Sequence, residues 1–282
     1  MLPQEYCQQK AAQSGSSFYY SFLFLPDNQR RAMTALYAFC REVDDVVDEC
    51  LDVAVARVKL HWWRDEIHRL FAGAPQHPVT KALAEPIKHF KLPAEHFLEI
   101  IDGMEMDLDY NSYPSFKELS LYCHRVASMV GIMSVEIFGY ENKETLKYAH
   151  ELGMAFQLTN ILRDIGEDIQ RGRLYIPADE MARFNVTSDD IAQKRMTDNV
   201  RQLLQFQAQR AQEYYSLAFS HLADVDRYRQ RSGIIMAAIY QTLLTEIGKA
   251  DYQVLTQRIA LTPIRKLWIA WRTNRREKKH CH

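Results

Sequence analysis

The chain places apolar residues at the three- and four-residue spacing of an α-helix over most of its length. After Pro26 this spacing predicts one helical face, made of Ala32, Leu36, Phe39, Val43 and Val47. The same spacing predicts further helices over residues 53–71, 78–90, 93–108, 116–138, 143–170, 188–222 and 234–247, and a last one after residue 263. Turn-forming segments at 73–75, 111–115 and 171–177 separate some of them. Because no repeat, low-complexity tract or linker divides the chain, the pattern predicts one all-α domain covering residues 1–282.

Composition narrows the class of protein without indicating an activity. Apolar residues make up 47% of the 282 positions, so a sizeable core can form. Only 10 residues are Gly and 9 are Pro, which disfavours a turn-rich all-β fold. The net charge of -1 gives no basis for predicting a nucleic-acid partner, since such partners usually meet a basic surface.

The cysteines and the N-terminus bear on the cellular compartment. The five cysteines are widely spaced and contain no C-x-x-C pair, which predicts neither a disulfide framework nor a structural zinc site. The N-terminus lacks the basic-then-apolar build of a signal peptide, and no run of 18 uninterrupted apolar residues occurs. We therefore expect a cytoplasmic protein, soluble or attached peripherally to the inner face of the cell membrane.

Two predicted helices each carry a polar, acidic stripe next to their apolar face. The first stripe has spacings of four, three and four, and consists of Tyr37, Arg41, Asp44 and Asp48. The second has spacings of three, four and four, and consists of Gln157, Asn160, Asp164 and Asp168. These spacings put each set on one side of its helix, bordering the core. The two stripes could therefore face one another across a cavity.

Acidic pairs one helical turn apart suit a divalent cation. Mg²⁺ takes hard oxygen ligands and is normally held by one or two carboxylates together with waters and substrate phosphates. Like charges at this spacing repel, and next to a core the repulsion grows unless a cation relieves it. A lone D-x-x-x-D on a surface helix is common, however, and acids near helix ends also serve capping. Spacing alone leaves the metal site and the structural role both open.

Longer segments around these stripes resemble the squalene/phytoene synthase family. YAFCREVDDVVDE (37–49) and QLTNILRDIGEDIQRGRLYIP (157–177) are similar to its two aspartate-rich regions. SGSSFYYSFLFLP (14–26) resembles its N-terminal substrate segment, and YCHRVASMVG (122–131) the small-residue helix that lines its prenyl pocket. The resemblance runs from about residue 14 to 265. It implies the all-α isoprenoid-synthase bundle with a central cavity, and Mg²⁺-dependent head-to-head joining of two prenyl diphosphates.

The resemblance also implies roles for individual residues. The metal ligands would be Asp44, Asp48, Asp164 and Asp168, assisted by Asn160. Arg41 and Arg163 would contact the diphosphate, for which a planar guanidinium is suited. The reacting carbons would lie near Tyr37, Tyr122 and Tyr240. The remaining substrate-binding positions would be Ser16, Ser17, Phe18, Val126, Ala127, Val130, Gly131 and Gln157. Some relatives carry Lys where Ser16 aligns, which leaves the diphosphate contacts at that end open.

Within the family, several products are compatible with these segments. SGSSFYYSFLFLP together with KLHWWRDEIHRL (59–70) most resembles the bacterial presqualene diphosphate synthases of hopanoid biosynthesis. We therefore expect two farnesyl diphosphates to give presqualene diphosphate, without a requirement for NADPH. The alternatives are a phytoene synthase that joins two geranylgeranyl diphosphates, a squalene or dehydrosqualene synthase, and a non-enzymatic synthase-like assembly factor. A terpene cyclase would need no second substrate, and RLYIP argues against it. The resemblance also allows downstream isoprenoid enzymes as partners.

The predicted C-terminal helix, about residues 262–279, combines an apolar line with many basic residues. The apolar line consists of Leu261, Ile264, Trp268 and Trp271. The basic residues are Arg265, Lys266, Arg272, Arg275, Arg276, Lys278 and Lys279. This pattern is compatible with a solvated terminal helix and with an amphipathic helix that lies in a membrane interface.

Overall fold

A computed structural model describes residues 1–13, 18–50 and 52–279. Within these residues the regular structure is helical, and the only bridge outside it joins Ser112 and Leu174. The longer helices are α1 (Pro3–Gln13), α3 (Asp27–Glu49), α4 (Val53–Phe71), α5 (Pro78–His89), α6 (Ala94–Asp109), α7 (Phe116–Cys123), α8 (Met129–Phe138), α9 (Glu144–Asp168), α12 (Asp198–His221), α14 (Arg231–Lys249) and α15 (Pro263–Lys279). The shorter ones are α2 (Phe18–Phe22), α10 (Ala178–Arg183), α11 (Ser188–Ala192) and α13 (Asp224–Arg227). The predicted all-α class is confirmed.

Most predicted helices agree with the structure to within a few residues. Helices α1, α2, α10 and α13 lie where no helix was predicted. The predicted helix over 188–222 is wrong as a single element, because it is interrupted between α11 and α12. In the interruption Lys194 has a φ of 56°, and Asp190 accepts a hydrogen bond from Arg195 Nε at 2.9 Å. Thr197 then starts α12 by accepting a hydrogen bond from the Val200 amide.

The predicted helix over 116–138 contains a π-helical turn. Its residues His124–Ser128 connect α7 to α8, and this turn packs against α9. The backbone of α9 lies close to that of the π turn, since a Cβ on Gly153 would lie 2.6 Å from Ser128 Cα. Likewise a Cβ on Gly131 would lie 2.5 Å from the Ala149 carbonyl oxygen. By length and composition the described run Phe116–Phe138 could also cross a membrane, but here it is an internal helix of the bundle.

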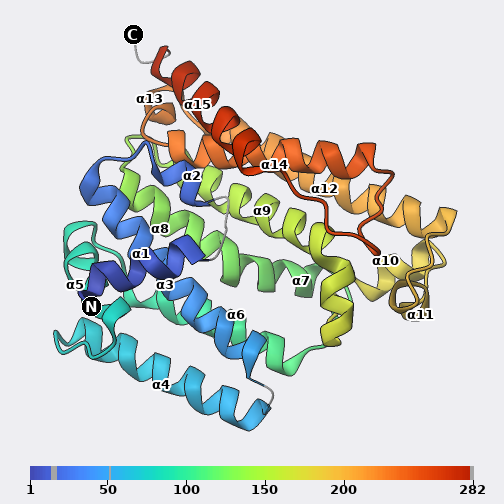
Figure 1. Cartoon of the computed structure of the whole chain (residues 1–282), viewed down its shortest axis with the longest axis horizontal. Helices are drawn as coiled ribbons and strands as arrows, with labels where there is room; N and C mark the ends of the chain where they lie inside the picture. Colours follow the sequence, from blue (N-terminus) through green and yellow to red (C-terminus); the bar gives the residue numbers. More distant parts are fainter. Residues whose placement is uncertain (14–17, 51, 280–282) are drawn as a thin grey trace.

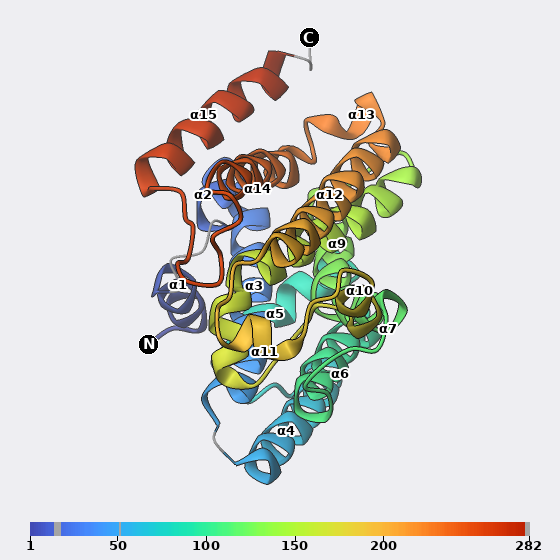
Figure 2. The same cartoon turned by 90° about the vertical axis from the view of Figure 1, so that its right-hand side faces the viewer.

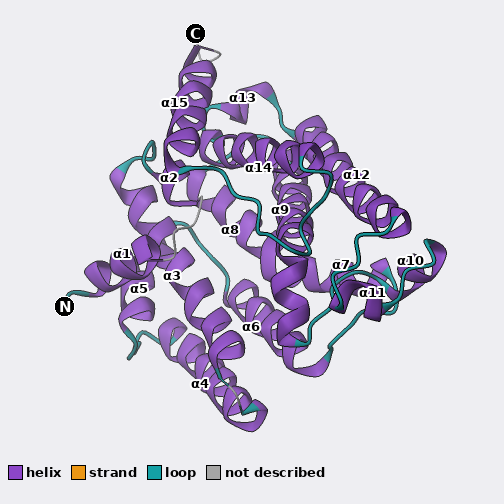
Figure 3. Ribbon diagram, turned by 45° about the vertical axis from the view of Figure 1, so that its right-hand side comes forward, coloured by secondary structure: helices purple, strands orange, loops and turns teal. Residues whose placement is uncertain are grey.

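Helix α9 runs through the middle of the molecule, between two groups of helices (Figures 1 and 2). On one side α3, α4, α5 and α6 surround one apolar core, and on the other α9 packs along α12 and α14 around a second core. Phe18, Val126 and Ile132 pack against both cores. Helix α15 lies outside the bundle on α14 and α2, at the end opposite α4 (Figures 1 and 3). The boundary between the two cores is where the cavities lie.

Candidate active site

Both acidic stripes line one polar cavity of about 560 Å³. This volume is within the usual range for small-molecule sites. The stripe on α3 contributes Tyr37, Arg41, Asp44 and Asp48, and the stripe on α9 contributes Gln157, Asn160, Asp164 and Asp168. Arg163, Tyr122 and Tyr240 line the same cavity. The structure thus brings together the residues that the resemblance assigned to metal, diphosphate and reacting carbons.

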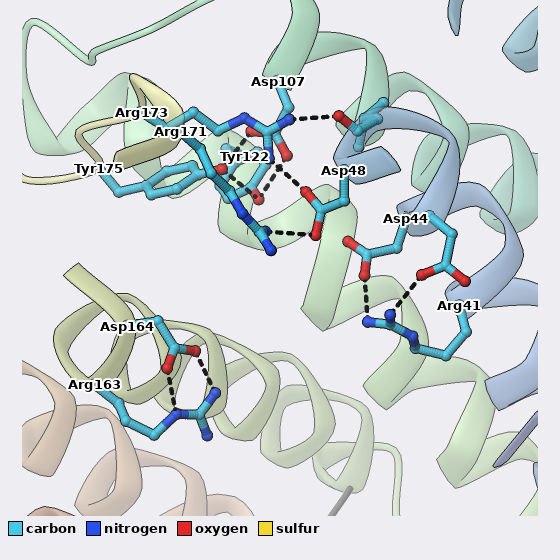
Figure 4. A network of polar contacts seen from close by, with 12 residues as sticks. Arg41, Asp44, Asp48, Asp107, Tyr122, Arg163, Asp164, Arg171, Arg173 and Tyr175 are labelled. Carbon is cyan, nitrogen blue, oxygen red and sulfur yellow. Dashed lines mark hydrogen bonds and ion pairs between the residues drawn. The ribbon is translucent and has the colours of Figure 1, made fainter. Parts of the chain in front are cut away.

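Arginines hold the carboxylates on both sides of this cavity. Arg41 donates to Asp44 and to Asp45, each at 2.5 Å. Across the cavity, both nitrogens of a guanidinium edge of Arg163 donate to Asp164 (Figure 4). Arg258, from the segment before α15, also donates to Asp164, at 2.9 Å. The guanidinium groups of these three arginines can provide charge-assisted hydrogen-bond donors for the oxygens of a phosphate group.

Two arginines beyond α9 reach back to α3, and neither was predicted as a site residue. Arg171 and Arg173 donate to the two oxygens of Asp48 at 2.8 and 2.7 Å, as Figure 4 shows. Arg173 also donates to the Val47 carbonyl oxygen at 2.8 Å. Gly172 lies between them with a φ of 77° and ends the helical turn that follows α9. Arg173 is the first residue of RLYIP and Arg171 lies two residues before it. The motif could therefore have identified both as candidate site residues.

A buried carboxylate, Asp107 on α6, was also missed. It accepts hydrogen bonds from Tyr175 at 2.8 Å and from Tyr122 at 3.1 Å, and these two rings stack with centroids 5.1 Å apart. Burial raises the pKa of Asp107 to about 6, while Arg173 and the two hydroxyls oppose the rise. The available signal was its position, because Asp107 continues the apolar face of Ile100 and Met104.

The donor set of the cavity fits a divalent cation. Burial, together with the charge of neighbouring carboxylates, raises the pKa of Asp44 and of Asp168 to about 7, against the attraction of nearby arginines. The side-chain oxygen of Asn160 is buried and has no hydrogen-bond partner among the described residues. No three His, Cys, Asp or Glu side chains of the described chain gather closely enough to hold a metal on their own. The aspartates of the two stripes supply the oxygen ligands that Mg²⁺ prefers, and Mg²⁺ usually completes its shell with waters and substrate phosphates.

An apolar cavity adjoins the polar one at its inner end. Phe18, Tyr37, Val126, Gln157 and Asn160 are among the residues that line both. Deeper in, the wall includes small and branched residues of the π turn and α8, namely Ala127, Val130 and Gly131. Hence Gly131 both lines this cavity and allows α9 to approach α8. The predicted Ser16 and Ser17 lie outside the described residues.

Aromatic rings cluster where the two cavities meet. The Phe18 ring lies 5.6 Å from Tyr37 and 6.3 Å from Phe156, measured between centroids. Phe156 in turn lies 5.0 Å from Tyr240. Aromatic faces attract positive charge through their quadrupoles, so this junction could stabilise a cation formed between the two cavities.

Comparisons with known proteins agree with this geometry. The profile of the squalene/phytoene synthase family matches residues 11–265. A phytoene synthase from Arthrospira platensis is 36% identical, over 93% of this chain and 89% of its own length. The 15-cis-phytoene synthase of Synechococcus elongatus is 34% identical with the same coverage.

Solved structures of similar fold include squalene and dehydrosqualene synthases. The crystal structure of squalene synthase HpnC from Alicyclobacillus acidocaldarius superposes with a TM-score of 0.81 at 29% identity, covering 89% of this chain and 94% of that one. A ligand-bound dehydrosqualene synthase gives a TM-score of 0.86 at 27% identity, covering 98% and 97%. The protein belongs to the squalene/phytoene synthase family, whose members are prenyltransferases that join two prenyl diphosphates head to head.

Proposed function

We propose that this protein joins two farnesyl diphosphates head to head into presqualene diphosphate, with release of one diphosphate and one proton. The observation that carries the proposal is the pair of adjoining cavities. One holds carboxylates and arginines suited to diphosphate and metal, and the other is an apolar channel suited to a hydrocarbon tail. A prenyl diphosphate has this same division between a charged head and an apolar tail.

The residues of the polar cavity would act on the diphosphate group. Arg41 and Arg163 would donate hydrogen bonds to its oxygens and hold it as it leaves carbon 1. Asp44, Asp48, Asp164 and Asp168, with Asn160, would hold Mg²⁺. When bound, Mg²⁺ neutralises phosphate charge and makes diphosphate a better leaving group.

The residues at the junction would act on the hydrocarbon. Departure of diphosphate leaves an allylic cation, which the rings of Tyr37, Phe18 and Phe156 would stabilise while excluding water. The double bond of the second farnesyl diphosphate then forms a bond to this cation. Loss of a proton closes the cyclopropane ring, so one C–O and one C–H bond break and two C–C bonds form. No reductant is consumed, and NADPH is therefore not needed.

The second candidate is a phytoene synthase acting on two geranylgeranyl diphosphates. It is favoured by the curated relatives, which include the phytoene synthases of A. platensis and S. elongatus. The two solved relatives described above, in contrast, are a squalene and a dehydrosqualene synthase. A non-enzymatic assembly factor would have no need of the four aspartates that line the polar cavity.

Product analysis separates these candidates. The protein is incubated with Mg²⁺ and either farnesyl or geranylgeranyl diphosphate, with or without NADPH, and the products are identified by mass spectrometry. We expect presqualene diphosphate from the C15 substrate, in equal yield without NADPH. Phytoene from the C20 substrate alone would establish the second candidate instead. Squalene formed only with NADPH would show that the reaction continues past the cyclopropane.

We also propose that the protein is cytoplasmic and that α15 attaches it to an anionic bilayer. One face of α15 packs on the bundle through Ile269, Ala270 and Thr273. The opposite face exposes apolar side chains, including Ile264 at 80%, Trp268 at 54% and Trp271 at 51%. Tryptophan side chains of this kind favour the headgroup region of a membrane.

The charge of α15 selects an anionic surface. The only acid in the helix, Glu277, is fully buried and paired with Arg227 and Arg276. The outward charges of α15 are therefore all basic, and Arg272 and Arg275 lie over the rings of Trp268 and Trp271. Each basic residue near an anionic leaflet contributes about 1 kcal/mol of attraction.

Flotation with liposomes tests this attachment. We expect the full chain to float with vesicles containing phosphatidylglycerol, less with phosphatidylcholine alone, and less as salt is raised. The Trp268→Ser/Trp271→Ser variant should lose most of this binding. The matched control is Val55→Ser/Val58→Ser, whose side chains are also exposed, on α4, which lies at the end of the molecule opposite α15 (Figure 1). Equal flotation of both variants would refute attachment through α15.

A further inference from the structure

The apolar cavity ends in two polar side chains that have no protein partner. Tyr148 on α9 and Gln230 just before α14 both line this cavity and are 1% and 0% exposed. Among the described residues, nothing forms a hydrogen bond with the Tyr148 hydroxyl or with the Gln230 side-chain oxygen. The Gln230 amide nitrogen is held, since it donates to the Gly139 carbonyl oxygen at 2.9 Å. A buried donor and a buried acceptor thus remain unsatisfied at one place.

This place is the end of the cavity farthest from the carboxylates. Tyr148 precedes Asn160 by twelve residues on α9, a distance of about 18 Å along the helix axis. Asn160 lines both cavities, whereas Tyr148 lines only the apolar one. Helix α14 runs in the same direction along the cavities. Gln230, just before its first residue, lines only the apolar cavity, and Tyr240 lines only the polar one. A prenyl tail whose diphosphate sits in the polar cavity would therefore point toward Tyr148.

Gly233 leaves room for the Tyr148 hydroxyl. A Cβ at position 233 would lie only 2.8 Å from the hydroxyl oxygen and 3.5 Å from Leu152 Cδ2. The hydroxyl thus points at the first turn of α14, where Gln230 and Ser232 also border the cavity. The absence of a side chain at Gly233 keeps this end open.

We propose that Tyr148 and Gln230 hold an ordered water at this end, and that the water sets the prenyl chain length the cavity accepts. A buried water is retained where it satisfies polar groups that would otherwise be unpaired. A tail that stops short of the water leaves these hydrogen bonds intact. A tail one isoprene unit longer must displace the water and press hydrocarbon against an unpaired hydroxyl and carbonyl, which disfavours it. This inference rests on the proposed function, because it assumes a prenyl tail.

A competition assay measures the effect. Farnesyl and geranylgeranyl diphosphates are supplied together, and the ratio of kcat/KM for the C20 over the C15 substrate is taken from the products. Tyr148→Phe removes one of the two groups that hold the water and keeps the ring, so this ratio should rise about tenfold, the equivalent of one unpaired polar group. Gly233→Ala fills space at the same end and should lower the ratio.

The matched control is Tyr215→Phe on α12. Tyr215 is also fully buried, but its hydroxyl lies 3.0 Å from Thr159 Oγ1, and it lines neither of the two cavities. Its ratio should equal that of the unmodified protein. A ratio unchanged in both Tyr148→Phe and Gly233→Ala, in proteins that melt normally, would overturn the proposal.

A structural readout separates this inference from the proposed function. A high-resolution crystal structure of the unmodified protein should show a water within hydrogen-bond distance of Tyr148 Oη, and that of Tyr148→Phe should lack it. No such water in the unmodified protein would refute the inference whatever the activity. If instead the unmodified protein converts neither substrate, the proposed function fails while the water remains testable.

Discussion

The Asp44→Asn variant should lose product formation by a factor of about a hundred or more, comparable to removal of one electrostatic contact to a reacting group. Asp44 lines the polar cavity opposite Asp164, and desolvation together with neighbouring carboxylates raises its pKa to about 7. An amide in its place can neither balance a divalent cation nor orient Arg41 by charge. The equivalent change on the other stripe, Asp164→Asn, should have an effect of similar size. Both are measured as turnover of farnesyl diphosphate at saturating Mg²⁺.

Folding should be little affected by Asp44→Asn. A carboxyl whose pKa is raised on folding destabilises the folded protein above its unfolded pKa, and the destabilisation increases up to about pH 7. Removing this charge at pH 8 should therefore keep or raise the melting temperature, and Arg41 retains its second partner, Asp45. The control is Asp27→Asn, an exposed acid on the same helix. Full turnover in both Asp44→Asn and Asp164→Asn would refute the metal role of these stripes.

The Arg173→Met variant should lose about 2 kcal/mol of unfolding free energy, intermediate between a surface and a fully buried ion pair. Arg173 joins α3 to the segment after α9, and its side chain is 12% exposed. Without it, Asp48 loses its more buried partner and Asp107 loses a compensating positive charge. Turnover should fall about tenfold or more, because the carboxylate of Asp48 is no longer positioned. Urea unfolding measures the first effect and product formation the second.

Two comparisons show whether this loss comes from the ion pair. Arg171→Met removes a contact of nearly the same length to the same Asp48, but Arg171 is 53% exposed, so it should cost at most about 1 kcal/mol. The double variant Asp48→Asn/Arg173→Met should recover part of the stability, since position 48 no longer carries a charge that needs Arg173 or repels Asp107, yet remain inactive. Equal destabilisation by Arg171→Met and Arg173→Met would contradict the burial argument.

Sequence predicted the parts of the site that follow helical periodicity. Asp44 and Asp48, and Asp164 and Asp168, are each one turn apart, so their common side of the helix follows from spacing. Spacing carries no information about Arg173, which reaches Asp48 across 125 residues of sequence. Asp107 lies on the apolar face of α6, which marks it as a buried acid, but its partners Tyr122 and Tyr175 come from other segments and follow only from tertiary contact.

The fold was predicted well where single helices have continuous apolar faces. Helix α4 has the bounds expected from its pattern. The break between α11 and α12 was not recognised, because a left-handed residue at Lys194 and an N-cap at Thr197 interrupt the helix without any Gly or Pro. The π turn within 116–138 was likewise not predicted, since it depends on close packing against Gly153.

The cavities lie between two apolar cores, so ligand binding in them should affect the stability of the whole protein. Carboxylates of α3 and of α9 face one another across the polar cavity, so a bound ion and its phosphates would add a further link between the two sides of the bundle. A ligand that binds only the folded protein raises the free energy of unfolding, and at high ligand concentration the increase grows with the logarithm of that concentration. The protein without bound substrate should therefore unfold at a lower temperature than the protein saturated with it.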